Sequence, residues 1–297
     1  MNVFNGTIQW FCLLCFCLLS LISKGNCTQI TARQLGLYMS QASYCEEERL
    51  ENWDCYTCDE SVSLFRIIEQ HGEKAIIGLY ENTMIVSFRG SSNILNWIDN
   101  VQFSLSCPYN NPSICVETGF YKVFEYMKND IYEALYSLIR THGLKSPKLL
   151  IGGHSLGAAV ATLMTYDILN TMEAMELTQE LNVRYIELVT FGSPRVGNEA
   201  FVYDFMETTK NPHLRTFERV THAYDIVPHL PQQFLGYDHI PHEIWYNEEN
   251  TVTTSCDDEY DYEEDPQCSN SCGPLHCTSI SDHLNYMNIS MGSDGDC

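Results

Sequence analysis

The chain has 297 residues, of which 44% are apolar and 12% aromatic, so it can bury a sizeable core and is not expected to be disordered. Thirty-nine acidic against sixteen basic residues give a net charge of −23. This charge excludes nucleic acid as a default partner and disfavours adsorption to anionic membranes.

An apolar run of about 13 residues, Trp10 to Ile22, precedes the small residues Ser23 and Gly25. The run is too short to span a bilayer and has the length of a signal-peptide core. We therefore predict a secretory signal over residues 1–25, with its end within two residues, and a single domain over 26–297. An N-terminal membrane anchor is the alternative. The sequons at Asn26 and Asn288 agree with glycosylation of a secreted chain.

Cysteine content also favours an oxidising compartment, because the chain has 14 cysteines and reducing compartments keep thiols few. Ten cysteines follow Cys27, an even set, and several of them stand close together in the sequence. No histidine pattern completes a zinc site around Cys55 and Cys58. Disulfides are therefore expected, and a metal is not.

The secondary-structure signals alternate along the chain. Residues 74–80 and 83–88 are expected to form a β-hairpin turning at Glu81-Asn82, and apolar residues at helical spacing predict a helix over 120–139 that ends at Gly143. Strands are then predicted at 148–152, 185–191 and 214–220, with a long helix after Ser155. Apolar strands alternating with helices predict an α/β fold with a sheet covered on both faces.

One segment has a biased composition, with seven acidic residues among the nine of 257–265, between Cys256 and Cys268. Such a run is usually a solvated surface loop. A calcium-binding loop is the alternative, although the segment lacks the glycine and terminal Glu of an EF-hand.

The main catalytic motif is Gly153-His154-Ser155-Leu156-Gly157, which lies between an apolar strand and a helix-forming run. This is the context of a nucleophile elbow, a sharp strand-to-helix turn that presents a serine above a sheet. The glycines are needed because the turn leaves no room for side chains. The N–H of Leu156 then lies where an oxyanion would form.

A nucleophilic serine needs a base, and the base needs an orienting carboxylate, in the chain order Ser, Asp, His for this fold. Asp225 and His283 satisfy that order after Ser155. On order alone, Asp238 with His242 or His276 also satisfies it. His154 is expected to pack beneath the turn rather than to act as the base.

These residues resemble those of class 3 lipases, the fungal triacylglycerol lipase family of α/β-hydrolases. The matching stretches run in family order and cover nearly all of the expected mature chain. They are Ser87-Phe-Arg-Gly-Ser-Ser92, Asn96-Trp-Ile98, Gly153 to Gly157, Phe191-Gly-Ser-Pro-Arg-Val-Gly-Asn198, Asp225-Ile-Val-Pro-His-Leu-Pro231 and Asp282-His283-Leu284.

The resemblance implies a central, mostly parallel sheet with a short helical lid, a Ser155–Asp225–His283 triad, and an oxyanion hole at Ser91 and Leu156. It also implies no cofactor and no metal. The family's disulfides suggest the pairs Cys45–Cys297, Cys55–Cys58 and Cys256–Cys268, which leaves Cys107–Cys115 and Cys272–Cys277 as additional bridges. Ala158 departs from relatives that carry a third glycine after the elbow.

The segment after Ser91 has an apolar helical face that resembles the family's lid, a helix that covers the site in water and opens at a lipid surface. An ordinary packed surface helix is the alternative. The residues of the apolar face are Ile94, Leu95, Trp97, Ile98 and Val101.

These features together predict a secreted serine hydrolase that cleaves lipid esters at an oil–water or membrane interface, with a triacylglycerol lipase as the main expectation. A phospholipase or a feruloyl-type esterase on the same scaffold is the alternative. A catalytically inactive lipid-binding protein is a more remote one, because every triad member is present. No obligate protein partner is evident.

Overall fold

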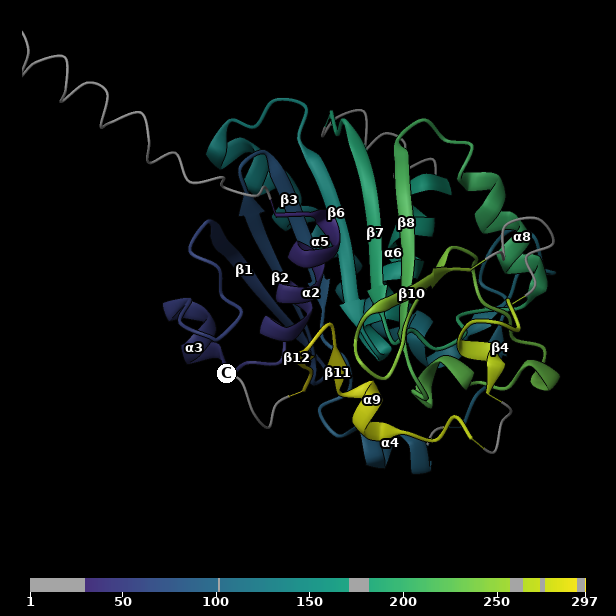
Figure 1. Ribbon diagram of the computed structural model, residues 1–297. Coiled ribbons are helices and arrows are strands. Elements are labelled where there is room, and N and C mark those ends of the chain that lie inside the picture. Colours follow the sequence, from purple (N-terminus) through teal and green to yellow (C-terminus); the bar gives the residue numbers. More distant parts are fainter. Residues whose placement is uncertain (1–29, 101, 171–181, 257–263, 273–275, 293–296) are drawn as a thin grey trace, which may run out of the picture. The chain divides into compact units, whose positions relative to one another are not determined.

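An eight-stranded sheet forms the centre of the structure, with the strand order β1-β2-β3-β6-β7-β8-β9-β10 (Figure 1). The computed structural model describes residues 30–100, 102–170, 182–256, 264–272, 276–292 and 297. The strands from β3 through β9 pair in parallel, whereas β1, β2 and β10 join the edges in antiparallel pairs. The predicted mostly parallel sheet is thus confirmed, and the expected signal peptide lies outside the described residues.

The helices and strands follow one another along Ala32–Cys297, which clusters as one unit. The helices are α2 Ala32–Ala42, α3 Glu47–Asn52, α4 Ile94–Asn100, α5 Thr118–His142, α6 Leu156–Asn170, α8 Glu199–Thr208 and α9 Ile280–His283. Short 3₁₀ helices are η1 Val227–His229, η2 Gln233–Leu235 and η3 Ser269–Ser271. The strands are β1 Val62–Gln70, β2 Glu73–Tyr80, β3 Thr83–Phe88, β4 Leu105–Ser106, β5 Val116–Glu117, β6 Lys148–His154, β7 Tyr185–Phe191, β8 Leu214–His222, β9 Glu243–Tyr246, β10 Val252–Ser255, β11 Asn285–Tyr286 and β12 Ile289–Ser290.

Helices cover both faces of the sheet, as expected from its apolar strands. Two neighbouring glycines of β6 show the two sides: a Cβ on Gly152 would lie 4.0 Å from the Cα of Gly36 in α2, and one on Gly153 would lie 2.5 Å from the carbonyl carbon of Gly157 in α6. Because neighbouring residues of a strand face opposite sides, α2 and α6 lie on opposite faces. Figure 1 shows α2 in front of the sheet and α6 behind it.

Local signals fix several of these elements. The strands β2 and β3 pair as the expected hairpin, with Glu81 at φ 53° in the turn. Helix α5 ends at Gly143, whose φ of 60° is left-handed and whose N–H donates to the carbonyl of Ile139, as the sequence predicted. Among the described helices, none is both long and apolar enough to cross a bilayer.

The carboxyl ends of the parallel strands gather the polar residues of interest. Arg89 follows β3, Ser155 follows β6, Gly192 follows β7, and Asp225 follows β8 after a short turn. In parallel sheets these ends share one edge, where ligands commonly bind. Helices α4 and α9 lie at the same end of the sheet in Figure 1.

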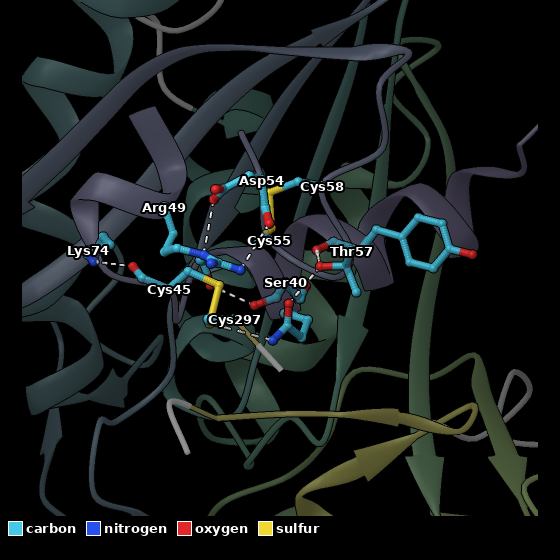
Figure 2. The surroundings of a disulfide bond; sticks show 12 residues. Ser40, Cys45, Arg49, Asp54, Cys55, Thr57, Cys58, Lys74 and Cys297 are labelled. Carbon is cyan, nitrogen blue, oxygen red and sulfur yellow. Dashed lines mark hydrogen bonds and ion pairs between the residues drawn. A yellow bond between two sulfur atoms is a disulfide. The ribbon is translucent and has the colours of Figure 1, made fainter. Parts of the chain in front are cut away.

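Disulfides join all five cysteine pairs that the resemblance suggested, namely Cys45–Cys297, Cys55–Cys58, Cys107–Cys115, Cys256–Cys268 and Cys272–Cys277. Figure 2 shows that Cys297, at the last position, is bonded to Cys45 just after α2. The buried ammonium of Lys74 donates to the carbonyl oxygen of Cys45 at 2.8 Å, which fixes the same corner to β2.

Candidate functional site

Ser155 lies at the sharp turn between β6 and α6. Its φ is +59°, a left-handed value that serine adopts only at some cost in energy, and its side chain is buried. A Cβ on Gly157 would approach the carbonyl carbon of Phe88 to 2.6 Å, so a side chain there would push β3 away from the turn. The sequence G-x-S-x-G therefore follows from close packing of the turn against β6 and β3.

Asp225 and His283 lie together, although 58 residues separate them in the sequence. The Nδ1–H of His283 donates to the Oδ2 of Asp225 at 2.9 Å, and both side chains are buried. Their two segments are joined by a parallel bridge between Asp225 and Ser279, in which the N–H of Ile226 donates to Ser279. The backbone therefore holds α9 and its histidine beside the carboxylate.

The carboxylate of Asp225 has further partners. The N–H of Val227 donates to its Oδ1 at 2.8 Å, and the hydroxyl of Tyr286 donates to its Oδ2 at 2.5 Å. Burial, and then the nearby Asp225 charge, raise the pKa of Tyr286 well above its ordinary value, so the phenol remains a donor. Gly192, with φ +56°, leaves room for this arrangement, because a Cβ there would lie 2.9 Å from the Nδ1 of His283.

The polar ends of Ser155 and His283 remain available for chemistry. Within the described residues, neither the Oγ of Ser155 nor the Nε2 of His283 has a hydrogen-bond partner, although both atoms are buried. Since Nδ1 of His283 is the donor to Asp225, Nε2 of a neutral ring is the basic nitrogen. Both residues line a cavity of about 320 Å³ that Ser91 also lines.

His154 lies within the turn and supports His283. Its Nε2 is 2.8 Å from the carbonyl oxygen of His283, which can only accept, so Nε2 carries the proton. Its Nδ1 then accepts a hydrogen bond from the hydroxyl of Tyr44 at 2.7 Å. Burial, and then the neighbouring His283, lower the pKa of His154 well below 6.5. The expectation that His154 packs beneath the turn agrees with these contacts.

Ser91 and Leu156, the two expected oxyanion-hole residues, come together from different strands. Both line a second cavity of about 350 Å³, together with Trp97 and Phe120. Gly90 brings the Ser91 loop against the turn, because a Cβ on Gly90 would lie 2.7 Å from the carbonyl oxygen of His154. Two backbone N–H groups from such loops are the donors that an oxyanion requires.

The segment expected to be a lid forms helix α4, none of whose side chains is buried. Trp97 contacts the rings of Phe103 and Phe120, with centroids 6.0 and 6.4 Å away, whereas Leu95 is 55% exposed. Leu95 also lines the cavity of Ser155 with Ile94. Val101 lies outside the described residues. The helix thus separates the cavity from solvent while exposing apolar area.

The structure places the alternative residues elsewhere. Asp238 lines a separate cavity with Glu264, His242 packs against the ring of Phe217, and His276 is exposed. The acidic segment lies outside the described residues except for its last two members. One of these, Glu264, forms two hydrogen bonds of 2.6 Å with Arg195, whose side chain is buried.

Two groups of side chains in the described residues have the spacing of metal ligands. They are His229 with Cys272 and Cys277, and Glu243 with Cys256 and Cys268. All four cysteines are in disulfides, so none can supply the thiolate that binds zinc.

Sequence reasoning did not assign roles to Tyr286, Gly192 or Tyr44. A tyrosine three residues after the candidate base, and a glycine at the carboxyl end of a predicted strand, are the signals that could have pointed to the first two. Tyr44 has no comparable local signal, because its contact with His154 spans 110 positions.

Comparison with known proteins agrees with this geometry. The family model described as lipase (class 3) matches residues 85–235. A lipase of Rhizomucor miehei is 32% identical over 266 residues, covering 86% of this chain and 67% of the relative. A lipase of Rhizopus niveus is 30% identical over 263 residues, and the chain spans only 62% of its length.

A solved triacylglycerol lipase whose catalytic centre is a serine protease triad superposes with a TM-score of 0.69. It is 29% identical and the match covers 88% of this chain and 94% of that one. The matched residues include Ser91, the Ser155 turn and Asp225, so the family signature and the site coincide. The chain belongs to the class 3 lipase family.

Proposed function

We propose that this protein is a secreted triacylglycerol lipase that works through an acyl-enzyme on Ser155. The observation that carries the proposal is the hydrogen bond from His283 Nδ1 to Asp225, which leaves Nε2 free beside the cavity that Ser155 lines. The solved relative with the same kind of triad is a triacylglycerol lipase, which supports the substrate class.

In this proposal the Nε2 of His283 accepts the proton of Ser155 as Oγ attacks the ester carbonyl. The N–H groups of Ser91 and Leu156 stabilise the oxyanion, and the carboxylate of Asp225 stabilises the imidazolium. The imidazolium then protonates the leaving alcohol, and a water molecule attacks the acyl-enzyme by the same steps in reverse.

Helix α4 is proposed as the lid. Leu95 and Ile94 line the serine cavity, and Trp97 lines the cavity at Leu156, so movement of α4 would open both at once. The exposed Leu95 would meet the lipid surface. Secretion and removal of residues 1–25 belong to the same proposal and are supported by the ten disulfide-bonded cysteines.

The test measures fatty acid released from emulsified triolein and from phosphatidylcholine vesicles, with Ser155→Ala as the control. Loss of the nucleophile should lower turnover by roughly 10³-fold or more while the thermal midpoint stays within a few degrees. Ser92→Ala, at an exposed neighbour lining the same cavity, controls for surface disturbance. Release mainly from phosphatidylcholine would change the substrate, cleavage of short soluble esters alone would indicate an esterase, and undiminished activity in Ser155→Ala would refute the mechanism.

A further inference from the structure

A turn outside the catalytic residues carries the most exposed large apolar side chain of the described structure. Phe234 is 84% exposed and the adjacent Leu235 is 47% exposed. Both belong to η2, Gln233–Leu235, which follows the loop that carries Asp225. Exposing a phenylalanine to water costs free energy, so a contact that covers it would be favourable.

The turn holds Phe234 in place. The N–H of Leu235 donates to the carbonyl of Gln232, and that of Gly236 to Gln233. Gly236 closes the turn in the left-handed region at φ 83°, and the next residue, Tyr237, is buried. The side chain is therefore presented from a fixed base, which reduces the entropy lost when it binds.

The base of this turn adjoins the proposed lid. The ring of Phe103, just after α4, lies 6.0 Å from Trp97 and 6.3 Å from Tyr237. A continuous aromatic contact thus runs from the lid to the Phe234 turn. Leu95 on α4 and Phe234 are accordingly exposed on neighbouring parts of one surface.

Carboxylates border the same turn. Gln233 and Gly236 line a cavity of about 760 Å³ together with Glu199, Asp238 and Glu264. With a net charge of −23 for the whole chain, this border would repel an anionic surface and tolerate an uncharged one.

We propose that Phe234 and Leu235 form a second lipid anchor beside the lid, which inserts into uncharged or zwitterionic lipid surfaces while Glu199 and Asp238 select against anionic ones. A narrow turn suits insertion between head groups better than it suits a protein interface, which needs a broad flat area. The inference deepens the proposed function, because it assigns the kind of surface on which that function would operate.

The test measures binding to sedimentable vesicles in the Ser155→Ala background, so that no lipid is consumed. Phe234→Ser should lower partitioning onto phosphatidylcholine vesicles by about 10-fold or more. Tyr56→Ser is the matched control, since Tyr56 is 71% exposed on the segment between Cys55 and Cys58, and it should bind within about twofold of the parent. Equal binding of the Phe234→Ser variant and the parent would overturn the anchor.

A second arm tests the charged border at low ionic strength. Phosphatidylglycerol in the vesicles should weaken binding of the parent, and Glu199→Gln with Asp238→Asn should recover about fivefold for each charge removed. No recovery would overturn the selection against anionic lipid. Phe234-dependent binding without any ester hydrolysis by the unmodified chain would refute the proposed function alone, whereas hydrolysis with Phe234-independent binding would refute only the anchor.

Discussion

Tyr286 and His283 donate hydrogen bonds to the same atom, the Oδ2 of Asp225, at 2.5 and 2.9 Å. All three side chains are buried. The tyrosine therefore holds the carboxylate in the plane that the imidazole needs, and the Oδ1 is held separately by the N–H of Val227. The carboxylate has no freedom to turn away from the histidine.

We expect Tyr286→Phe to lower kcat by roughly 10-fold, because a hydrogen bond to a charged group contributes about 1.5–3 kcal/mol and part of this orients Asp225. KM for a short soluble ester should change little, since Tyr286 does not line the serine cavity. Steady-state kinetics on that ester would measure both. An unchanged kcat, with a lowered thermal midpoint, would show that the hydroxyl serves stability alone.

Gly90 determines how closely the Ser91 loop approaches the turn. A Cβ there would lie 2.7 Å from the carbonyl oxygen of His154 and 2.9 Å from the Cβ of Ser155, both in rigid parts of the turn. Gly90→Ala should therefore displace Ser91 and lower kcat by about 10²-fold, the effect expected when one oxyanion donor is lost.

The control for Gly90→Ala is Ser92→Ala, which changes an exposed residue of the same loop and should keep most of the activity. The readout is kcat on a short soluble ester, so that lipid binding does not enter. Near-normal turnover by Gly90→Ala would show that the loop tolerates the displacement and that Ser91 is not a required donor.

The local part of the site could be predicted from the sequence, because the Ser155 turn needs only a strand, two glycines and a helix in succession. The pairing of Asp225 with His283 could not be derived from order alone, since Asp238, His242 and His276 fitted equally well. The resemblance named the pair, and the geometry brings it together. Tyr286 and Tyr44 act through contacts made only in the folded chain, and the exposure of Phe234 depends on what the fold leaves uncovered.

The disulfides should differ in their effect on stability according to the length of chain they close. Cys45–Cys297 closes a separation of 252 residues and Cys55–Cys58 one of 3. Loop-closure entropy predicts losses of about 5 kcal/mol for the first and about 2 kcal/mol for the second on replacement of both cysteines by serine. Denaturant unfolding of the two double variants would measure the difference, and equal losses would contradict the entropic account.

The last prediction concerns acid sensitivity. Burial, and then the charges of Arg219 and Arg195, lower the pKa of His239 well below 6.5, and its Nε2–H donates to the carbonyl of Pro228 at 2.7 Å. The folded chain thus keeps this ring neutral while the unfolded chain protonates it below about pH 6.5. Its contribution to stability is fully present above that pH and decreases as the pH falls.

Other groups act in the opposite direction. Burial raises the pKa of Glu73 and Glu117, so their contribution is present at low pH and is lost as the pH rises through their folded pKa. The effect of His239 must therefore be isolated by comparison with His239→Gln, whose amide can donate the same hydrogen bond without titrating. Below about pH 6.5 the free energy of unfolding of the parent should fall more steeply than that of the variant, by up to about 1.4 kcal/mol per pH unit. Chemical denaturation at a series of pH values measures both slopes, and parallel curves would show that His239 takes up its proton in the folded chain as readily as in the unfolded one.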